Sequence, residues 1–546
     1  KTTRVPVRIC NMSAQAIRIP PRSSLCLLNE VQVVDSWHPE PSKPSVAGES
    51  TRCKSLEDMG VKINTNSLTP DQLQRAREVI GNWDHIFSKS STDLGKTDLV
   101  QHHIRLTDDV PFKQPFRRIP PAMFEEVRQH LNDMLESGAI RKSKSPYCSN
   151  VVLIRKKDGC LRLCIDMRQL NAKTVKDAYS LPRINDTLDT LIGAKYFSKL
   201  DLHSGFWQVE IAEEDKHKTA FSLGPLGFWE CNRMAFGLTN APSTFQRLME
   251  TCMGELNLRE CLIFLDDILI FSDTFDEHLK RLQGVFERIE KHGLKLKPSK
   301  CEFFKTKVSY LGHVVSEIGI QTDPEKISAL TTWPAPTNIK TLRSWLGFTG
   351  YYRRFIKDYA KIVKPLNDLL IGHPTDKKAK RKRKQVPWTW DLLQQQAFET
   401  IREKLISPPI LAYADFKKPF ILTTDASTDG LGSVLYQEQD GKERVIAYAS
   451  RGLRPSERNY PAHKLEFLCL KWAVTDKFHD YLYGNTFEVR TDNNPLTYVT
   501  KSAKLDATGH RWLASLSSYN FKLIYRSGKS NSDADGLSRR PYQAEE

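Results

Sequence analysis

The sequence predicts a multidomain chain of mixed structure, in which a long α+β portion precedes a compact α/β unit. Its 546 residues suffice for roughly three or four domains, and 40% hydrophobic with 27% charged residues is typical of a globular protein. Helical and strand patterns alternate from "SLTPDQLQRAREVI" to about residue 370. Beyond a basic stretch, "FILTTDAS" to "DADGLSRR" predicts strands, a long helix, another strand and further helices, in ~150 residues.

The composition indicates a polyanionic partner and disfavours a membrane. A net charge of +16 and a pI near 9.2 make nucleic acid the first expectation. No apolar run approaches the roughly 20 residues of a membrane-spanning helix, and "KTTRVPVRIC" has no apolar segment behind its basic residues, so we expect a chain that is not secreted. The eleven cysteines contain no CxxC pair and are expected to be reduced, mostly buried thiols.

Two stretches predict linkers. Residues 1–60 alternate weakly and then become rich in proline and serine, which predicts a short β segment followed by a linker. Seven of the eight residues from Lys377 to Lys384 are basic, and such a block stays solvated. A nuclear-localisation signal and a phosphate-attracting tether are both open for it.

"GKS" at 528–530 resembles the end of a P-loop. Leu523 stands where the motif requires its first glycine, so we exclude a P-loop at this place.

The stretch "CLIFLDDILIFSD" places two adjacent carboxylates between apolar runs. Leu262 to Leu265 and Ile268 to Phe271 predict a hairpin with Asp266 and Asp267 at or beside its tip. A turn in which aspartate merely suits the backbone is the alternative. Upstream, "YFSKLDLHSGFWQVEI" predicts an alternating strand that contains Asp201.

Clustered carboxylates on apolar strands need compensation. Burying ionised acids costs several kcal/mol each, and placing them together adds repulsion. A pair of divalent cations removes that cost and is what in-line phosphoryl transfer needs, and ligands that are all oxygen favour Mg²⁺ over zinc. The cluster therefore predicts a polymerase or a nuclease.

Longer motifs identify the family. "SNVVLIRKKDGCLRLCIDMRQLNAKT", "LPRINDTLDTLIGAKYFSKLDLHSGFWQVEI", "KTAFSLGPLGFWECNRMAFGLTNAPSTFQRLM", "FLDDILIFS" and "YLGHVVSEIGI" closely resemble, in order, the reverse transcriptase of gypsy-type LTR retrotransposons. The resemblance implies an α+β right-hand polymerase joined to an α/β ribonuclease H-like domain. Its parts would be a polyprotein region downstream of a protease (1–60), fingers and palm (61–322), thumb (323–375), basic linker (376–390) and ribonuclease H domain (391–541).

The resemblance assigns the catalytic, metal-binding acids of the palm to Asp201, Asp266 and Asp267. Phe206 matches the aromatic that packs against the sugar of the incoming nucleotide, where a bulky ring leaves no room for a 2′-hydroxyl. A core aromatic beside Trp207 is the alternative.

The other predicted nucleotide contacts are Lys156, Arg162, Leu202, Phe236 and Gly237. Lys156 and Arg162 match the fingers cations that grip the triphosphate, although a basic hairpin can also be a solvated face. Phe236 and Gly237 stand where retroviral enzymes have Gln-Gly, a departure shared with gypsy elements that puts the usual glutamine contact in question.

Two segments resemble primer and template contacts. "YLGH" resembles the hairpin that positions the primer end, with an ordinary strand pair as the alternative. "TLRSWLGFTGYYRRFIKDYAKIVKPL" resembles the thumb, where one helix would both track a duplex backbone and bury aromatics. The predicted contacts are Tyr310, Leu311, Gly312, His313, Tyr351, Tyr352, Arg353 and Arg354.

A second set of acids lies in the C-terminal unit, too widely spaced for a local motif. As an ordered set they resemble the four metal-binding, catalytic acids of ribonuclease H, which converge on two Mg²⁺ ions that activate water against an RNA phosphodiester. They are Asp425, Glu466, Asp492 and Asp535, with Asp533 as the competing choice for the last.

The resemblance implies an RNA- and DNA-dependent DNA polymerase with ribonuclease H activity, for retrotransposon replication. Expected cofactors are Mg²⁺ ions, two at each site, with Mn²⁺ as a substitute. Expected partners are an RNA template, a DNA primer and product, the RNA–DNA hybrid, deoxynucleotides and a tRNA or self primer; monomer and homodimer both stay open. We expect an intracellular location, in a cytoplasmic virus-like particle or the nucleus.

The motifs are compatible with two other hypotheses about the function of the chain. A host-adopted or degenerate copy would bind nucleic acid without catalysis, and a plant pararetroviral polymerase would have a similar palm and ribonuclease H. No Asp-Ser/Thr-Gly protease motif and no His-His-Cys-Cys integrase module is present, so we expect a segment of a larger polyprotein.

Overall fold

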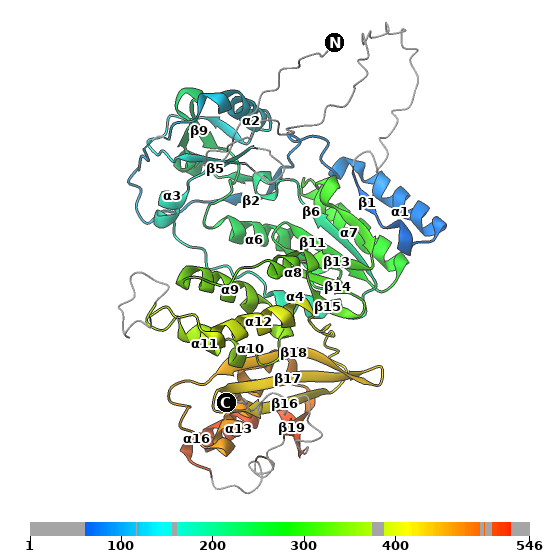
Figure 1. The fold of residues 1–546 in the computed structure, drawn as a ribbon. Coiled ribbons are helices and arrows are strands. Elements are labelled where there is room, and N and C mark those ends of the chain that lie inside the picture. Colours follow the sequence, from blue (N-terminus) through cyan, green and yellow to red (C-terminus); the bar gives the residue numbers. More distant parts are fainter. Residues whose placement is uncertain are drawn as a thin grey trace, which may run out of the picture. The chain divides into compact units, whose positions relative to one another are not determined.

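The computed structural model describes residues 60–115, 117–155, 161–373, 387–491, 496 and 505–525. All of these residues fall in one unit, whose helices and strands are drawn in Figure 1. Its buried apolar residues form three hydrophobic cores. The predicted N-terminal β segment and the basic block from Lys377 to Lys384 lie outside the described residues.

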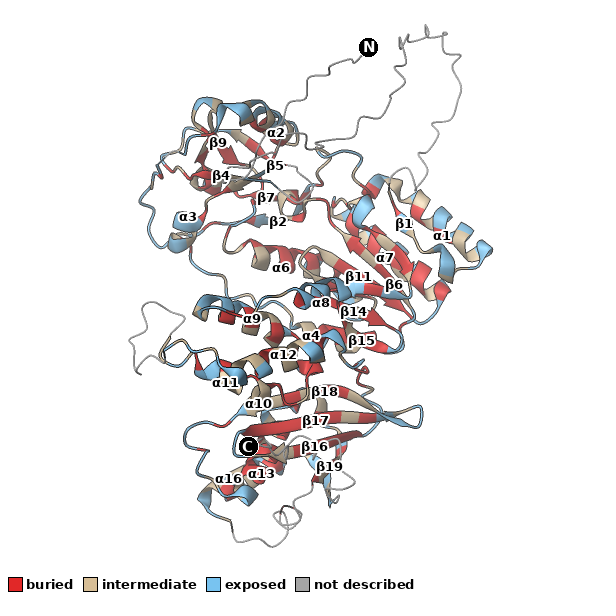
Figure 2. Ribbon diagram, in the orientation of Figure 1, coloured by how far each residue is buried: buried red, intermediate tan, exposed pale blue. Residues whose placement is uncertain are grey.

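A five-stranded sheet forms the predicted palm, in the order β1-β12-β6-β11-β10. Helices α6 and α7 pack on it, and Figure 2 shows β6, β11 and much of α7 as buried. Helix α7 packs there because its apolar residues recur at helical spacing, as in Leu279, Leu282 and Phe286. The bounds are β1 (Lys62–Ile63), β6 (Tyr196–Asp201), β10 (Cys261–Phe264), β11 (Asp267–Ser272), β12 (Glu302–Lys305), α6 (Ala241–Met253) and α7 (Phe275–Lys291).

Three smaller sheets belong to the predicted fingers and share the first core with the palm. Helix α1 (Pro70–Asn82) begins at a capping box, in which Thr69 and Gln72 exchange side-chain and backbone hydrogen bonds. The strands are β2 (Thr97–His102) with β7 (Val209–Ile211), β3 (Ile140–Lys142) with β9 (Phe228–Cys231) and β8 (Phe221–Ser222), and β4 (Val151–Arg155) with β5 (Leu161–Ile165). The other helices are α2 (Phe124–Glu136), α3 (Arg168–Lys173) and α5 (Glu213–Lys216), whereas α4 (Ile184–Leu188) buries Leu188 in the second core.

A three-stranded sheet and the helices of the predicted thumb share the second core. Trp345 on α9 is fully buried and its ring lies 4.4 Å from that of Phe398 on α12, measured between centroids. Helix α12 thus packs with the thumb, although the sequence analysis places it in the C-terminal domain. The bounds are β13 (Lys307–Tyr310), β14 (His313–Ser316), β15 (Gly319–Thr322), α8 (Pro324–Thr331), α9 (Ile339–Tyr351), α10 (Tyr359–Ile362), α11 (Lys364–Asp368) and α12 (Leu392–Ile406).

The C-terminal sheet has the order β18-β17-β16-β19-β20, antiparallel over the first three strands and parallel over the last three. Helix α13 packs on β16 and buries the third core. The bounds are β16 (Phe420–Ala426), β17 (Gly430–Gln439), β18 (Lys442–Gly452), α13 (Ala462–Lys471), α14 (His479–Leu482), β19 (Thr486–Thr491), α16 (Ala507–Leu516) and β20 (Asn520–Tyr525).

Three predicted elements differ from the structure. The alternating strand through Asp201 ends there, because Ser204 takes a left-handed conformation (φ 53°) and the next four residues form a 3₁₀ turn. The thumb helix ends at Tyr351, so Arg353 and Arg354 lie in a separate 3₁₀ turn. The sequence analysis also missed β20, whose short polar and apolar alternation it took for helix.

Two expectations from the sequence, on membrane-spanning helices and on cysteines, apply to all of the described residues. None of their helices is long and apolar enough to cross a membrane. The seven cysteines among them are all unpaired, and five of these are buried, as expected of reduced thiols.

Candidate active sites

The palm acids meet at one end of the β6, β10 and β11 ladder. Asp201 lies directly opposite Asp267 in the antiparallel pairing of β6 with β11. Asp266 shares the two-residue tip of the β10–β11 hairpin with Leu265, because Phe264 pairs with Asp267. Side chains opposite one another on neighbouring strands are about 5 Å apart at Cβ, so the structure brings all three predicted acids together. Asp267 begins β11 rather than the turn.

The acids crowd one another enough to shift a pKa. Burial raises the pKa of Asp266 above its usual range, and the charges of Asp201 and Asp267 raise it further. Two lysines partly offset the charge: Lys300 Nζ lies 3.0 Å from both carboxylate oxygens of Asp201, and Lys199 Nζ lies 3.1 Å from Oδ1 of Asp267. Their ligands, which are all oxygen, are of the type that divalent cations of the Mg²⁺ class prefer, although the three carboxylates do not all bring an oxygen within 4.8 Å of one another here.

One glycine allows the 3₁₀ turn to approach the β10–β11 hairpin. A Cβ on Gly205 would lie 2.8 Å from Cζ of Phe245 and 3.4 Å from Cβ of Asp266. A side chain at this position would push the turn away from the acids. The turn continues into Phe206, so the close approach also sets the position of that ring.

The predicted nucleotide contacts that the structure describes form an aromatic and cationic group. The rings of Phe206 and Phe236 are 5.1 Å apart at their centroids, and the guanidinium of Arg162 lies 5.0 Å from the centroid of Phe236. Arg162 comes from β5, so fingers and palm both contribute. Leu202 is buried and contributes to the core. Lys156 lies outside the described residues.

Asn171 on α3 fixes the loop that holds Phe236. Its amide nitrogen donates to the carbonyl oxygen of Gly237 at 2.7 Å, and its oxygen accepts from the backbone N–H of Thr239 at 2.9 Å. Gly237 has φ +96°, a conformation that favours glycine. Sequence reasoning missed Asn171, since only its position across the loop shows its role.

The predicted primer hairpin is bound by the thumb. The hydroxyl of Tyr351 donates to the carbonyl oxygen of Leu311 at 2.5 Å, and that of Tyr352 donates to Gly312 at 2.8 Å. His313 is buried against three aromatic rings, and its desolvation lowers its pKa to about 4. The β13–β14 turn therefore carries a neutral histidine at neutral pH and is attached to α9.

Four of the predicted primer and template contacts have side chains too buried to reach a duplex. Tyr310 and Tyr352 are at most 1% exposed, His313 is 3% exposed, and Arg354 is 8% exposed with its Nη1 donating to Oδ1 of Asn185 at 2.6 Å. Their side chains support the hairpin and the thumb from within. Direct contact stays a prediction for the exposed side chains of Tyr351 and Arg353.

The second set of acids is described in part. Glu466 on α13 accepts at Oε1 from the backbone N–H of Ala426 at 3.1 Å, which places it beside the end of β16, where Asp425 lies. Beneath them Cys469 Sγ lies 3.4 Å from the carbonyl oxygen of Asp425, and burial raises the pKa of this thiol. Asp492 and Asp535 lie outside the described residues, as does the competing Asp533.

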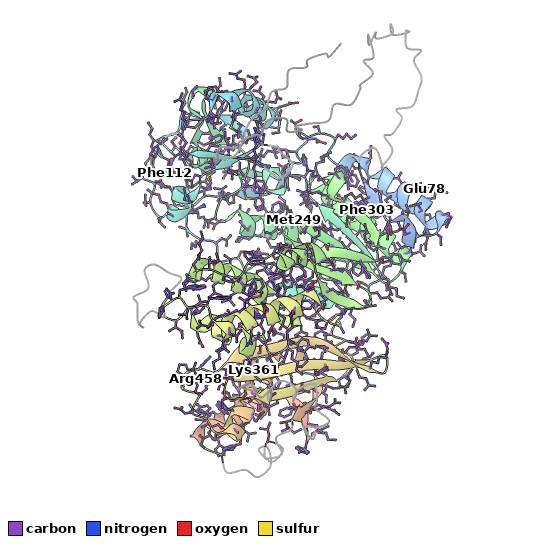
Figure 3. All side chains as sticks on the ribbon, viewed as in Figure 1. Glu78, Phe112, Met249, Phe303, Lys361 and Arg458 are labelled. Atoms are coloured by element: carbon purple, nitrogen blue, oxygen red, sulfur yellow. The ribbon has the colours of Figure 1, made fainter. Side chains whose placement is uncertain are left out.

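A thumb lysine pairs with the first of these acids. Lys361 on α10, labelled in Figure 3, places Nζ 3.0 Å from Oδ2 of Asp425 and 3.8 Å from Oδ1 of Asp358. Its burial lowers the pKa of Lys361, but the two carboxylates outweigh this and the pKa is raised. Around it, the backbone N–H of Ala360 donates to Ser450 Oγ at 2.9 Å.

Family models and relatives agree on the two domains. Residues 154–315 match the model described as reverse transcriptase (RNA-dependent DNA polymerase), and residues 415–519 match that of the RNase H-like domain found in reverse transcriptase. The retrovirus-related Pol polyprotein from transposon opus of Drosophila melanogaster is 39% identical over 492 residues, which cover 88% of this chain and 49% of that protein. The Pol polyprotein from transposon gypsy of the same fly is 36% identical, covering 87% and 46%. The chain thus spans about half the length of these curated relatives.

A solved structure shares the fold. The foamy viral protease-reverse transcriptase in complex with dsDNA superposes with a TM-score of 0.74 at 21% identity, covering 88% of this chain and 98% of that one. A right-hand polymerase joined to a ribonuclease H-like domain is therefore the fold of this chain. The chain carries a reverse transcriptase domain followed by a ribonuclease H-like domain, and the resemblance to the Pol polyproteins of gypsy-type LTR retrotransposons is confirmed.

Proposed function

We propose that the palm of this chain synthesises DNA on RNA and then on DNA templates, and that its C-terminal domain cleaves the RNA strand of the resulting hybrid. The observation that carries the polymerase assignment is the pairing of Asp201 with Asp267 beside the hairpin tip that holds Asp266. The similarity to Pol polyproteins of retrotransposons supports retrotransposon replication as the process that these activities serve.

In the polymerase reaction the primer 3′-oxygen forms a bond to the α-phosphorus of a deoxynucleotide triphosphate, and pyrophosphate leaves. Asp201, Asp266 and Asp267 would hold two Mg²⁺ ions, with Mn²⁺ as a substitute, and bound cations activate the attacking oxygen and stabilise the leaving one. The raised pKa of Asp266 supports this, because crowded acids gain most from a cation.

The neighbouring side chains orient the reactants. Arg162 would bind triphosphate oxygens and the ring of Phe206 would exclude a 2′-hydroxyl, and the contact of both side chains with Phe236 supports this. The β13–β14 turn would hold the primer end, with α9 behind it. The net charge of +16 supports binding to an extended duplex, since phosphate contacts supply most of the affinity that does not depend on sequence.

The ribonuclease assignment rests on the second set of acids. Asp425 and Glu466, with Asp492 and Asp535, would hold the cations that activate water against an RNA phosphodiester. The foamy viral protease-reverse transcriptase is known in complex with dsDNA and with an RNA/DNA hybrid. We propose the same classes of partner here, together with a tRNA or self primer, and an intracellular, particle-associated location.

Two single variants separate the activities. A labelled DNA primer on an RNA template with its own 5′ label is incubated with Mg²⁺ and deoxynucleotides. Wild-type protein should extend the primer and shorten the template, Asp267→Asn should only shorten the template, and Glu466→Gln should only extend the primer. If wild-type protein binds the hybrid but does neither, the catalytic assignment fails and a nucleic-acid-binding protein takes its place.

A further inference from the structure

Gln246 is a fully buried polar residue of α6. Met249 and Met253, on the same side of the helix, are fully buried too, and Met249 is labelled in Figure 3. A buried amide costs stability unless its hydrogen bonds are made, so its partners show what it does.

The amide of Gln246 binds the catalytic hairpin. Its Oε1 accepts from the backbone N–H of Leu265 at 2.8 Å, and its Nε2 lies 3.4 Å from the carbonyl oxygen of Ile263. The same Nε2 donates to Oε1 of Glu250, one turn along α6, at 2.7 Å. One side chain thus binds strand β10 and the hairpin tip, directly before Asp266.

The tip needs such a support because its sequence does not suit its conformation. Leu265 has φ +54°, where two-residue hairpin loops usually carry glycine, asparagine or aspartate. A leucine in this region costs about 1 kcal/mol and is retained only where surrounding contacts impose it. The hydrogen bond to Gln246 supplies such a contact at Leu265 itself.

The support is itself anchored. Glu250 accepts a short hydrogen bond from the hydroxyl of Tyr179, whose pKa is raised to about 12 by burial and by Glu250. Arg247 lies 4.7 Å from the centroid of the Tyr179 ring and pairs with Asp177 at 2.8 Å. A chain of polar contacts therefore runs from residues 177–179 through α6 to the turn.

We propose that Gln246 is a positioning residue for DNA synthesis, which fixes the conformation of the Leu265–Asp266 turn and so the position of Asp266 relative to Asp201 and Asp267. The inference rests on the proposed polymerase function. A carboxylate displaced by a fraction of an ångström no longer shares its cations correctly, so the chemical step suffers more than nucleotide binding.

The test compares two buried polar side chains of the same helix. Gln246→Met keeps length and volume but removes the amide, whereas Thr244→Val removes the hydrogen bond that joins Thr244 Oγ1 to Nδ1 of His102 at 2.9 Å, away from the hairpin. Both should lower the thermal midpoint of the full chain by similar amounts. Only Gln246→Met should lower kcat for primer extension, by about 10- to 100-fold, with KM for deoxynucleotides within about twofold.

A double substitution tests rescue. In the double variant Gln246→Glu with Glu250→Gln, the amide and the carboxylate change places. The carboxylate at position 246 still accepts from the backbone N–H of Leu265, and the amide at position 250 donates to that carboxylate. This variant should recover most of kcat relative to Gln246→Met. RNA cleavage by each variant is measured on a preformed hybrid and should match wild type.

The outcomes are distinguishable. Equal kcat in Gln246→Met and Thr244→Val, with wild type extending primers, would show that Gln246 is only structural. A wild-type chain without extension overturns the proposed function itself. Loss of both activities together in Gln246→Met would also contradict positioning, since the described residues of the ribonuclease site, Asp425 and Glu466, contact Lys361 and Ala426, which lie outside this network.

Discussion

The ammonium nitrogen of Lys361 lies 3.0 Å from Oδ2 of Asp425, so a lysine of the predicted thumb neutralises the first acid of the ribonuclease H-like domain. Both side chains are mostly buried, at 13% and 17% exposed, which makes the pair stronger than a surface ion pair. A cation bound by Asp425 would have to displace the lysine or share the carboxylate with it.

Lys361→Met should therefore lower the Mg²⁺ concentration needed for half-maximal RNA cleavage, by about three- to tenfold. Lys364→Met is the matched control, because Lys364 pairs with Asp429 at 2.5 Å on the same surface and both partners are more exposed. Titration of cleavage with Mg²⁺ checks this. A higher requirement in Lys361→Met would mean that the lysine assists the site.

Acid should destabilise the β13–β14 hairpin through His313. Its folded pKa of about 4 lies below the usual 6.5, so the unfolded chain binds the proton first. This contribution is complete above pH 6.5, is lost as the pH falls through 6.5 toward 4, and amounts to about 3 kcal/mol. Burial is the main cause, and the charges of Arg354 and Lys326 add to it.

Denaturant unfolding between pH 7 and pH 4 measures the effect. His313→Asn should be less stable than wild type at pH 7 and should lose about 3 kcal/mol less over this range. The control variant His463→Asn, at an exposed position, should show the same change in unfolding free energy over this pH range as wild type. A His313→Asn curve parallel to wild type would contradict the assignment. His102 and His278, also buried with lowered pKa, remain in every variant.

Gly205→Ala should reduce primer extension strongly. The added methyl would meet Phe245 at 2.8 Å and Asp266 at 3.4 Å, and such overpacking costs about 1–3 kcal/mol. Gly347→Ala in α9 is the control, since nothing lies within 4 Å of its Cβ and a helix interior gains about 0.5–1 kcal/mol from alanine. Thermal unfolding and primer extension, measured on both variants, test this prediction. Normal extension by Gly205→Ala would show that the turn can move away freely.

Phe206→Val should admit ribonucleotides. The smaller side chain opens space beside the Phe236 ring, so the ratio of kcat/KM for deoxynucleotides over ribonucleotides should fall by about 10- to 100-fold. Single-nucleotide incorporation measures this ratio. Phe245→Leu, which alters the ring packed on the far side of Phe206 at 5.3 Å, controls for general loosening. An unchanged ratio would make Phe206 a core aromatic.

The sequence could predict those elements whose structure depends on residues close together in the chain. Two apolar runs around Asp266 and Asp267 predict a hairpin with acids at its tip, because strand periodicity and turn chemistry are local. The structure has this hairpin, shifted by one residue. The end of the strand at Asp201 was not predictable, because it coincides with a left-handed conformation at Ser204, and serine carries no local signal for that conformation.

Residues that act through tertiary contacts escaped the sequence analysis. Gln246 carries one local signal, a polar residue among apolar positions of an amphipathic helix, but its partner lies on another element. Lys361 carries no local signal of its contact with Asp425, because only the packing of α10 near β16 and β18 brings the two side chains together. The same holds for Arg354, which the sequence predicts on a duplex and the structure buries.

The two phenol hydroxyls of Tyr351 and Tyr352 hold successive carbonyls of the Leu311–Gly312 turn. These two hydrogen bonds couple the end of α9 directly to the β13–β14 turn, so a displacement of α9 would shift the turn in the same direction. If the turn holds the primer end, as proposed above, the orientation of the thumb would set where the primer terminus stands.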